Sequence, residues 1–189
     1  MSIVVILHNI RSIHNVGSIF RTADAAGCKR IYLCGITPTP TDRFGKIRPQ
    51  FAKVSLGAEK SVKWEKVRNT VPLIKKLKNL PTGGGYKIFA VEQSKNSIPY
   101  FKLPKSYILH SKFCLVLGSE VRGLPPSVLK RADKILEIPM RGAMVRQAHH
   151  PRRVGRGKES LNVSVAFGIV IFQLIYSHGR VRIAGARAK

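Results

Sequence analysis

Short apolar runs alternate along this sequence with longer stretches in which apolar residues recur every three or four positions. The short runs are rich in Ile, Val and Leu, as is typical of buried strands, and span residues 3–7, 30–34, 86–92, 113–117 and 135–138. The longer, helix-like stretches span residues 15–26, 69–80, 125–132 and 160–176. This alternation predicts an α/β fold in which a mostly parallel sheet is flanked by helices on both faces.

The pattern also indicates how exposed some of these elements are. Within residues 15–26 the apolar positions fall at i, i+3, i+4 and i+7, so this helix has one stripe that faces the core. Residues 160–176 are apolar on several faces, and we therefore expect that helix to be buried. Residues 37–49 contain three prolines and a glycine, which favours a loop.

Composition adds a strong charge signal to this picture. The chain has 189 residues, and 44% of them are hydrophobic, which is enough for a core and excludes wholesale disorder. We expect a single domain over residues 1–178, followed by a basic tail over residues 179–189. Lys and Arg total 34 against nine acids, a formal charge of +25. Such an excess favours a polyanionic partner, nucleic acid first and an anionic membrane second.

Membrane insertion and secretion are not expected. The longest apolar stretch, residues 161–176, is interrupted by polar residues and is shorter than a span of roughly 20 apolar residues. The three cysteines, Cys28, Cys34 and Cys114, lack C-x-x-C spacing, which indicates buried free thiols in a reducing compartment and gives a zinc site little support. The sequence therefore predicts a cytoplasmic protein without a membrane or metal partner.

Polar clusters follow several of the predicted strands, where an open parallel sheet places its ligand crevice. They span residues 9–17, 117–124, 138–142 and 160–164. Arg21, shortly after the first cluster, is either a solvated helix cation or a contact to phosphate or ribose. Glu120 is either an acid that favours a helix N-terminus or a crevice residue. Ser160 is a candidate cap for the last helix, whereas Asn162 needs a polar partner there.

These clusters resemble the motifs of a known family. Residues 15–23 resemble motif 1 of the SpoU/TrmH branch of the SPOUT RNA methyltransferases, and residues 115–124 resemble motif 2. Residues 138–140 and 160–166 resemble the two halves of motif 3, so the motifs occur in family order. The resemblance implies methyl transfer from S-adenosylmethionine to a ribose 2′-hydroxyl of tRNA or rRNA. It also implies a C-terminal trefoil knot and a homodimer with the active site at its interface.

The resemblance also assigns roles to individual residues. It implies that the catalytic residues are Asn15, Arg21, Glu120, Ser160 and Asn162. The residues that it implies for the methyl donor are Leu117, Gly118, Ser119, Ile138, Met140 and Leu161. RNA contacts are expected from Arg11, Arg21 and Arg122.

The role of Arg21 needs a chemical argument, because an arginine is effectively always protonated in proteins and is a poor general base. We expect Arg21 to hold a phosphate and to stabilise the developing alkoxide charge. A phosphate or solvent then takes the proton.

Motif 3 is interrupted in this sequence. Residues 141–159 separate its two halves, and the dipeptide Arg-Gly occurs at positions 141–142 and again at 156–157. We expect an inserted surface loop over about residues 143–157, which adds only modest closure entropy. The loop either stays clear of the site and lends its arginines (Arg146, Arg152, Arg153 and Arg156) to RNA, or it displaces Met140 and abolishes donor binding. The second case gives the alternative function, an RNA-binding protein of the same fold with impaired catalysis.

Overall fold

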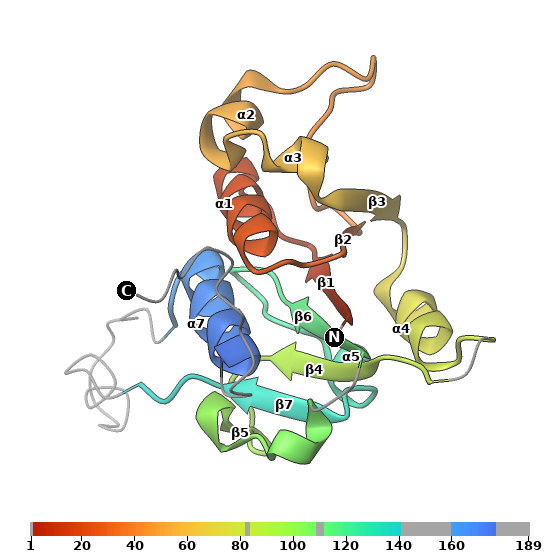
Figure 1. The fold of residues 1–189 in the computed structure, drawn as a ribbon, viewed down its shortest axis with the longest axis vertical. Coiled ribbons are helices and arrows are strands. Elements are labelled where there is room, and N and C mark those ends of the chain that lie inside the picture. Colours follow the sequence, from red (N-terminus) through yellow and green to blue (C-terminus); the bar gives the residue numbers. More distant parts are fainter. Residues whose placement is uncertain (1, 82–83, 109–111, 141–159, 177–189) are drawn as a thin grey trace, which may run out of the picture.

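The computed structural model describes residues 2–81, 84–108, 112–140 and 160–176 (Figure 1). The predictions made for the insert and for the basic tail lie outside these residues. So does much of the connection between β7 and α7 that the implied knot would involve, and the knot stays a prediction. Among the described residues, none of the helices combines the length and apolar character of a membrane span.

The described residues form one seven-stranded sheet in which all paired strands are parallel. Its spatial order is β3-β2-β1-β6-β4-β7-β5. In chain order, the strands are β1 (Ser2–His8), β2 (Arg30–Cys34), β3 (Lys63–Val67), β4 (Lys87–Val91), β5 (Ile98–Pro99), β6 (Lys112–Leu117) and β7 (Lys134–Glu137). The predicted α/β fold with a parallel sheet is confirmed.

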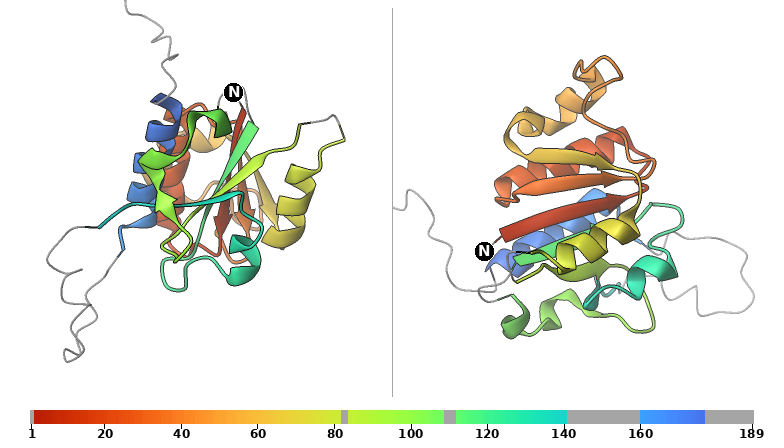
Figure 2. Two further views of the ribbon diagram at one scale, coloured as in Figure 1. Left: turned by 90° about the horizontal axis from the view of Figure 1, so that it is seen from below. Right: turned by 90° about the vertical axis from the view of Figure 1, so that its right-hand side faces the viewer.

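Helices cover both faces of the sheet (Figures 1 and 2). α1 (Ile13–Ala25) and α7 (Val163–Tyr176) pack on one face, and α4 (Thr70–Lys78) and α5 (Pro126–Leu129) pack on the other. The outer helices α2 (Pro49–Ser55) and α3 (Ala58–Ser61) pack against α1, while the short 3-10 turns η1 (Tyr100–Lys102) and η2 (Lys105–Tyr107) follow β5.

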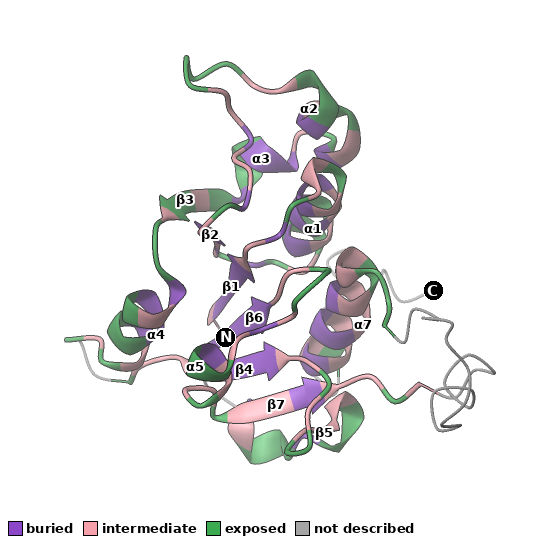
Figure 3. Cartoon of the chain, turned by 180° about the vertical axis from the view of Figure 1, so that it is seen from behind, coloured by how far each residue is buried: buried purple, intermediate pink, exposed green. Residues whose placement is uncertain are grey.

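The central strands β1 and β6 are buried on both faces (Figure 3). Alternate side chains of β1 therefore belong to two hydrophobic cores. Val5 lies in the core under α1 and α7 with Phe20 and Phe167, and Ile6 lies in the core under α4 with Ile74. A strand covered on both sides has no polar face, which explains its unbroken apolar sequence.

Several elements were not predicted. The edge strand β3 carries three charged residues in five and lacks an apolar run, as is common where an edge must resist pairing with other chains. The helices α2 and α3 span seven and four residues, too few to show a helical period. β5 has only two residues.

The prediction that the last helix is buried is wrong in part. α7 buries Phe167, Val170 and Leu174 against the sheet, but Val165 is 49% exposed and Tyr176 is 55% exposed. The reason is its position. α7 belongs to the outer layer on one face of the sheet, so the described residues cover only the side that faces the sheet (Figure 2). An apolar outer side is left on this helix.

The three cysteines are buried free thiols, as predicted. Burial raises the pKa of Cys28 to about 12 and also raises the pKa values of Cys34 and Cys114. Because the thiolate is the reactive form, we expect a soluble disulfide reagent to modify the native protein at least roughly a hundredfold more slowly than the unfolded chain. Absorbance of the released thiol, with and without denaturant, measures this difference. Rapid modification of any cysteine in the native protein would contradict it.

Candidate functional site

A tight loop over residues 118–124 follows the buried strand β6, and its shape depends on two glycines. A Cβ at Gly118 would lie 2.5 Å from the carbonyl carbon of Gly123. Gly123 has a φ of 62°, and a Cβ there would meet the carboxylate of Glu92. The Gly123 amide donates to the Ser119 carbonyl (2.8 Å), and Ser119 Oγ accepts from the amides of Val121 (3.2 Å) and Arg122 (3.4 Å). The loop is therefore a compact turn at the carboxyl edge of the sheet.

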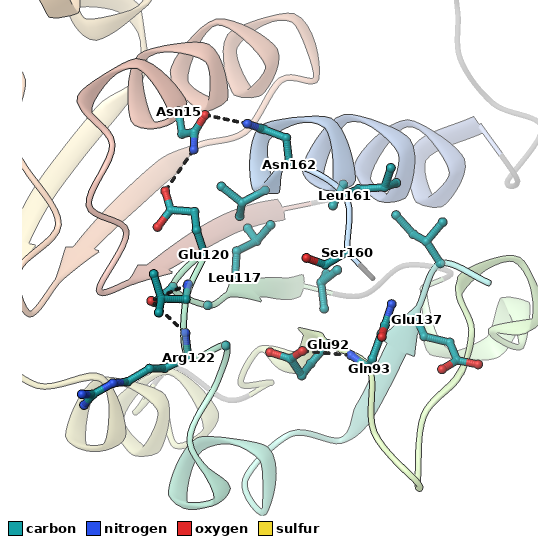
Figure 4. Close-up of a pocket in the computed structure, with 18 of the residues that line it drawn as sticks. Asn15, Glu92, Gln93, Leu117, Glu120, Arg122, Glu137, Ser160, Leu161 and Asn162 are labelled. Carbon is teal, nitrogen blue, oxygen red and sulfur yellow. Dashed lines mark hydrogen bonds between the residues drawn. The ribbon is translucent and has the colours of Figure 1, made fainter. Parts of the chain in front are cut away.

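A chain of hydrogen bonds joins this loop to the starts of α1 and α7 (Figure 4). Asn15 Nδ2 donates to Glu120 Oε1 (3.0 Å), and Asn162 Nδ2 donates to Asn15 Oδ1 (3.0 Å). The amide and the hydroxyl of Ser164 both donate to Asn162 Oδ1 (2.9 and 2.7 Å). Asn15, Glu120 and Asn162 come from three separate motifs, up to 147 residues apart, and the fold brings them into direct contact.

Glu120 remains ionised in this arrangement. Desolvation by partial burial opposes its charge, but hydrogen bonds from the Asn15 side chain and from the amides of Glu120, Arg11 and Ser12 lower its pKa below the usual value. The Arg11 amide donates to Glu120 Oε2 (3.2 Å) while Asn15 donates to the other carboxylate oxygen. Glu120 therefore presents a carboxylate that fixes the orientation of the Asn15 amide.

Asn162 rather than Ser160 caps α7. The helix begins at Val163, and Asn162 Oδ1 accepts the Ser164 amide at the second helical position. The interpretation of Ser160 as the helix cap is wrong, because Ser160 precedes the cap by two residues and lies at the cavity described next.

A cavity of about 690 Å³ opens between the ends of β4, β6 and β7 and the start of α7. The side of the cavity nearest α1 carries Asn15, Glu120 and Asn162 (Figure 4). The sequence-predicted site residues that line the cavity are Asn15, Leu117, Gly118, Ser119, Glu120, Arg122, Ile138, Met140, Ser160, Leu161 and Asn162. The three motif segments thus converge on one cavity.

Two predicted site residues do not line this cavity. Arg21 is exposed on the solvent side of α1, two helical turns beyond its start, and Arg11 is exposed in the segment between β1 and α1. The backbone amide of Arg11 reaches the site, where it donates to Glu120. The roles expected for both side chains stay predictions.

Three polar residues of the cavity were not predicted: Glu92, Gln93 and Glu137. Glu92 accepts the Leu124 amide at Oε2 (2.8 Å) and the Gln93 amide at Oε1 (3.0 Å), so it ties the end of β4 to the 118–124 loop. Glu137 accepts the hydroxyl of Ser97 (2.6 Å). Three of the nine acids of the chain, Glu92, Glu120 and Glu137, therefore line one cavity. The scarcity of acids and their position at predicted strand ends were the signals that could have found them.

The described ranges contain no group of three or more His, Cys, Asp or Glu side chains placed to hold a metal ion.

Comparison with known proteins yields a consistent set of relatives. A model of the SpoU rRNA Methylase family matches residues 2–146. The tRNA (guanosine(18)-2′-O)-methyltransferase of Aquifex aeolicus is 30% identical over 171 residues, which cover 90% of this chain and 67% of that protein. The 23S rRNA (guanosine-2′-O-)-methyltransferase of Salmonella typhi is 27% identical over 172 residues, which cover 91% of this chain but only 59% of that protein.

A solved structure shows the same arrangement of elements. The AdoMet-bound rRNA methyltransferase from Sinorhizobium meliloti superposes with a TM-score of 0.70 at 25% identity. The match covers 92% of this chain and 55% of that one. The described fold and the sequence motifs thus lead to the same group of proteins.

Proposed function

Because this chain belongs to the SpoU rRNA methylase family, we propose that it transfers a methyl group from S-adenosylmethionine to a ribose 2′-hydroxyl of tRNA or rRNA. The observation that carries the proposal is the contact of Asn15, Glu120 and Asn162, one from each motif, at the mouth of the cavity. The net charge of +25 supports an RNA substrate.

The cavity suits the proposed methyl donor in size and charge. Its volume of about 690 Å³ lies within the range of roughly 300–1,000 Å³ that is usual for small-molecule sites. Glu92, Glu120 and Glu137 line it, and carboxylates favour a ligand that carries a sulfonium and an ammonium group. The residues that would hold the donor are Leu117, Gly118, Ser119, Ile138, Met140 and Leu161. When bound, the donor supplies an electrophilic methyl group.

The residues of the hydrogen-bonded chain position the ribose. Glu120 accepts one Asn15 N–H and Asn162 donates to the Asn15 carbonyl oxygen, so the second Asn15 N–H is free to donate to a substrate oxygen. A fixed donor of this kind orients the reacting hydroxyl, and orientation supplies much of the rate enhancement in a transfer reaction. Arg21 provides a guanidinium for the phosphate and for the alkoxide charge that develops on the 2′-oxygen.

We propose that Arg21 reaches the cavity from a second copy of the chain. It does not line the cavity of its own chain, yet α1 packs against α7, and a Cβ added at Gly168 of α7 would lie 3.9 Å from Cγ2 of the next residue, Thr22. The exposed apolar side of α7, with Val165 and Tyr176, gives a second copy a surface on which to dock. A homodimer through α7 therefore carries Arg21 of each copy toward its partner.

The alternative of a catalytically impaired RNA-binding protein is not favoured. Ile138 and Met140 precede the insert and Ser160 and Leu161 follow it, and all four still line the same cavity. The two halves of motif 3 thus meet despite the residues between them.

The test is methyl transfer to RNA. We expect the protein to incorporate labelled methyl groups from S-adenosylmethionine into total tRNA or rRNA isolated from cells that lack the enzyme. Nuclease mapping should locate the label on a ribose. Asn15→Ala should abolish incorporation, while Asn96→Ala, in the exposed turn before β5, serves as the matched control. RNA binding without either donor binding or incorporation into any RNA would favour the alternative function.

A further inference from the structure

A short hairpin after β2 carries the most exposed large apolar side chain among the described residues. Phe44, at its tip, is 78% exposed. The hairpin consists of residues 41–48, and its ends are joined by an antiparallel bridge between Thr41 and Ile47. A ring so exposed contributes nothing to the core and is accessible to another molecule.

The tip of the hairpin is held in one conformation. Asp42 Oδ1 accepts the amides of Phe44 (2.8 Å) and Lys46 (2.9 Å), and the Asp42 amide donates to the Lys46 carbonyl (2.8 Å). Gly45, with a φ of 78°, completes the turn. Because these bonds fix the backbone on both sides of Phe44, the ring is presented to solvent with little entropy left to lose on binding.

The residues around the ring are cationic. The Arg43 guanidinium lies 4.7 Å from the centre of the Phe44 ring, and Lys46 is exposed on the other side of the tip. Arg48 donates to the Thr41 carbonyl at the base. Asp42 is the only acid of the hairpin, and its carboxylate already accepts two backbone amides. An exposed aromatic ring among cations is the combination with which proteins bind unpaired nucleotides.

The hairpin begins at the same edge of the sheet as the cavity. The loops after β6, β1 and β2, which are neighbouring strands, carry Arg122, Arg11 and the hairpin in that order. Parallel strands lie about 4.8 Å apart, so the end of β2 is about 10 Å from the end of β6. The hairpin then projects away from the sheet beside α2 (Figures 1 and 2). An RNA strand that enters the cavity has cations along this path.

We propose that the hairpin binds an unpaired nucleotide of the RNA substrate, with the base stacked on Phe44 and the adjoining phosphates at Arg43 and Lys46. This inference rests on the proposed function. It adds that the substrate offers an accessible base outside the cavity, which a loop or bulge supplies and a continuous duplex does not.

The experiment measures RNA binding without the methyl donor, so that it does not depend on catalysis. The probes are a mixed-sequence single-stranded RNA of roughly 12 nucleotides and a perfect RNA duplex of roughly 16 base pairs. We expect Phe44→Ala to weaken binding of the single strand roughly tenfold and to leave duplex binding unchanged, because stacking needs an unpaired base. Lys46→Ala should weaken both and reduce their salt dependence.

Two control variants separate stacking from a general change of surface. Phe101→Ala removes another exposed ring, in η1 beyond the opposite end of the sheet, and should leave single-strand binding unchanged. Phe44→Trp should retain or strengthen it. Equal binding of the single strand by the native protein and Phe44→Ala would overturn the hairpin proposal alone. Failure of the native protein to bind either RNA would overturn both this inference and the proposed function.

Discussion

Replacing Glu120 with glutamine is expected to lower the rate of methyl transfer by roughly a hundredfold or more. The two carboxylate oxygens accept N–H groups from Asn15 and from Arg11. A glutamine amide has one acceptor oxygen and one NH₂ group, so one of these N–H groups would face another donor. The Asn15 amide would then lose its fixed orientation. Single-turnover transfer of a labelled methyl group to RNA measures the effect.

The matched control is Glu137→Gln, which makes the same change at the same cavity. Within the described residues Glu137 accepts the hydroxyl of Ser97, and a glutamine oxygen can accept that bond equally well. At saturating S-adenosylmethionine we expect the rate of this variant to stay within about threefold of the native rate, because the lost carboxylate charge weakens only donor binding. Thermal unfolding should be nearly unchanged in Glu137→Gln, whereas Glu120→Gln should unfold at a slightly lower temperature because it loses the stabilising carboxylate. An equal loss in the two variants would contradict the specific role of Glu120.

The lowered pKa of Glu120 predicts how its contribution to the stability of the fold changes at acidic pH. Its pKa is lowered in the folded protein, where hydrogen bonds outweigh partial desolvation, so the carboxylate contributes stability at every pH above the ordinary glutamate range. That contribution is lost as the pH falls through the lowered pKa of the folded state. Glu120 therefore stays charged throughout the neutral range, and its titration does not limit the rate there.

How well the sequence predicts the fold depends on how each element is buried. β1 and β6 are covered on both faces, so their uninterrupted apolar runs identified them within one or two residues. β3 is a charged edge strand that depends on its pairing with β2, and no local pattern distinguishes it from a loop. The outer side of α7 shows the converse: its apolar residues predicted burial, but a sequence does not reveal which surfaces a second molecule covers.

The sequence identified most residues of the site but not the hydrogen bonds that join them. The motif strings identified Asn15, Glu120 and Asn162, yet their mutual hydrogen bonds join residues at least 105 positions apart and appear only once the chain folds. Glu92 was missed because it follows an ordinary strand, and its function as an acceptor for the Leu124 amide depends on the neighbouring loop. The start of α7 was misplaced because the Asn162 cap, rather than apolar periodicity, determines where the helix begins.

The second prediction with a large effect concerns Arg21, for which we propose a role in the active site of a second copy of the chain. Arg21→Ala and Glu120→Gln should each reduce the activity of the dimer by roughly a hundredfold. When the two variants are mixed so that subunits exchange, about half of the dimers are heterodimers, and one of the two cavities in each has a native Glu120 together with a native Arg21 from its partner. Activity should therefore recover to about a quarter of the native value. The measurement is methyl transfer before and after exchange, with separately tagged chains to count the heterodimers.

The double variant, with both substitutions in one chain, provides the control for this exchange. If Arg21 acts across the interface, a heterodimer of the double variant and the native chain has no complete site, because the native cavity receives the altered residue and the altered cavity lacks Glu120. If Arg21 acts within its own chain, that heterodimer keeps one active cavity while the mixture of single variants recovers nothing. The two mixtures therefore give opposite results under the two arrangements. The exposed position of Arg21 outside its own cavity, together with the exposed apolar side of α7, favours action across the interface.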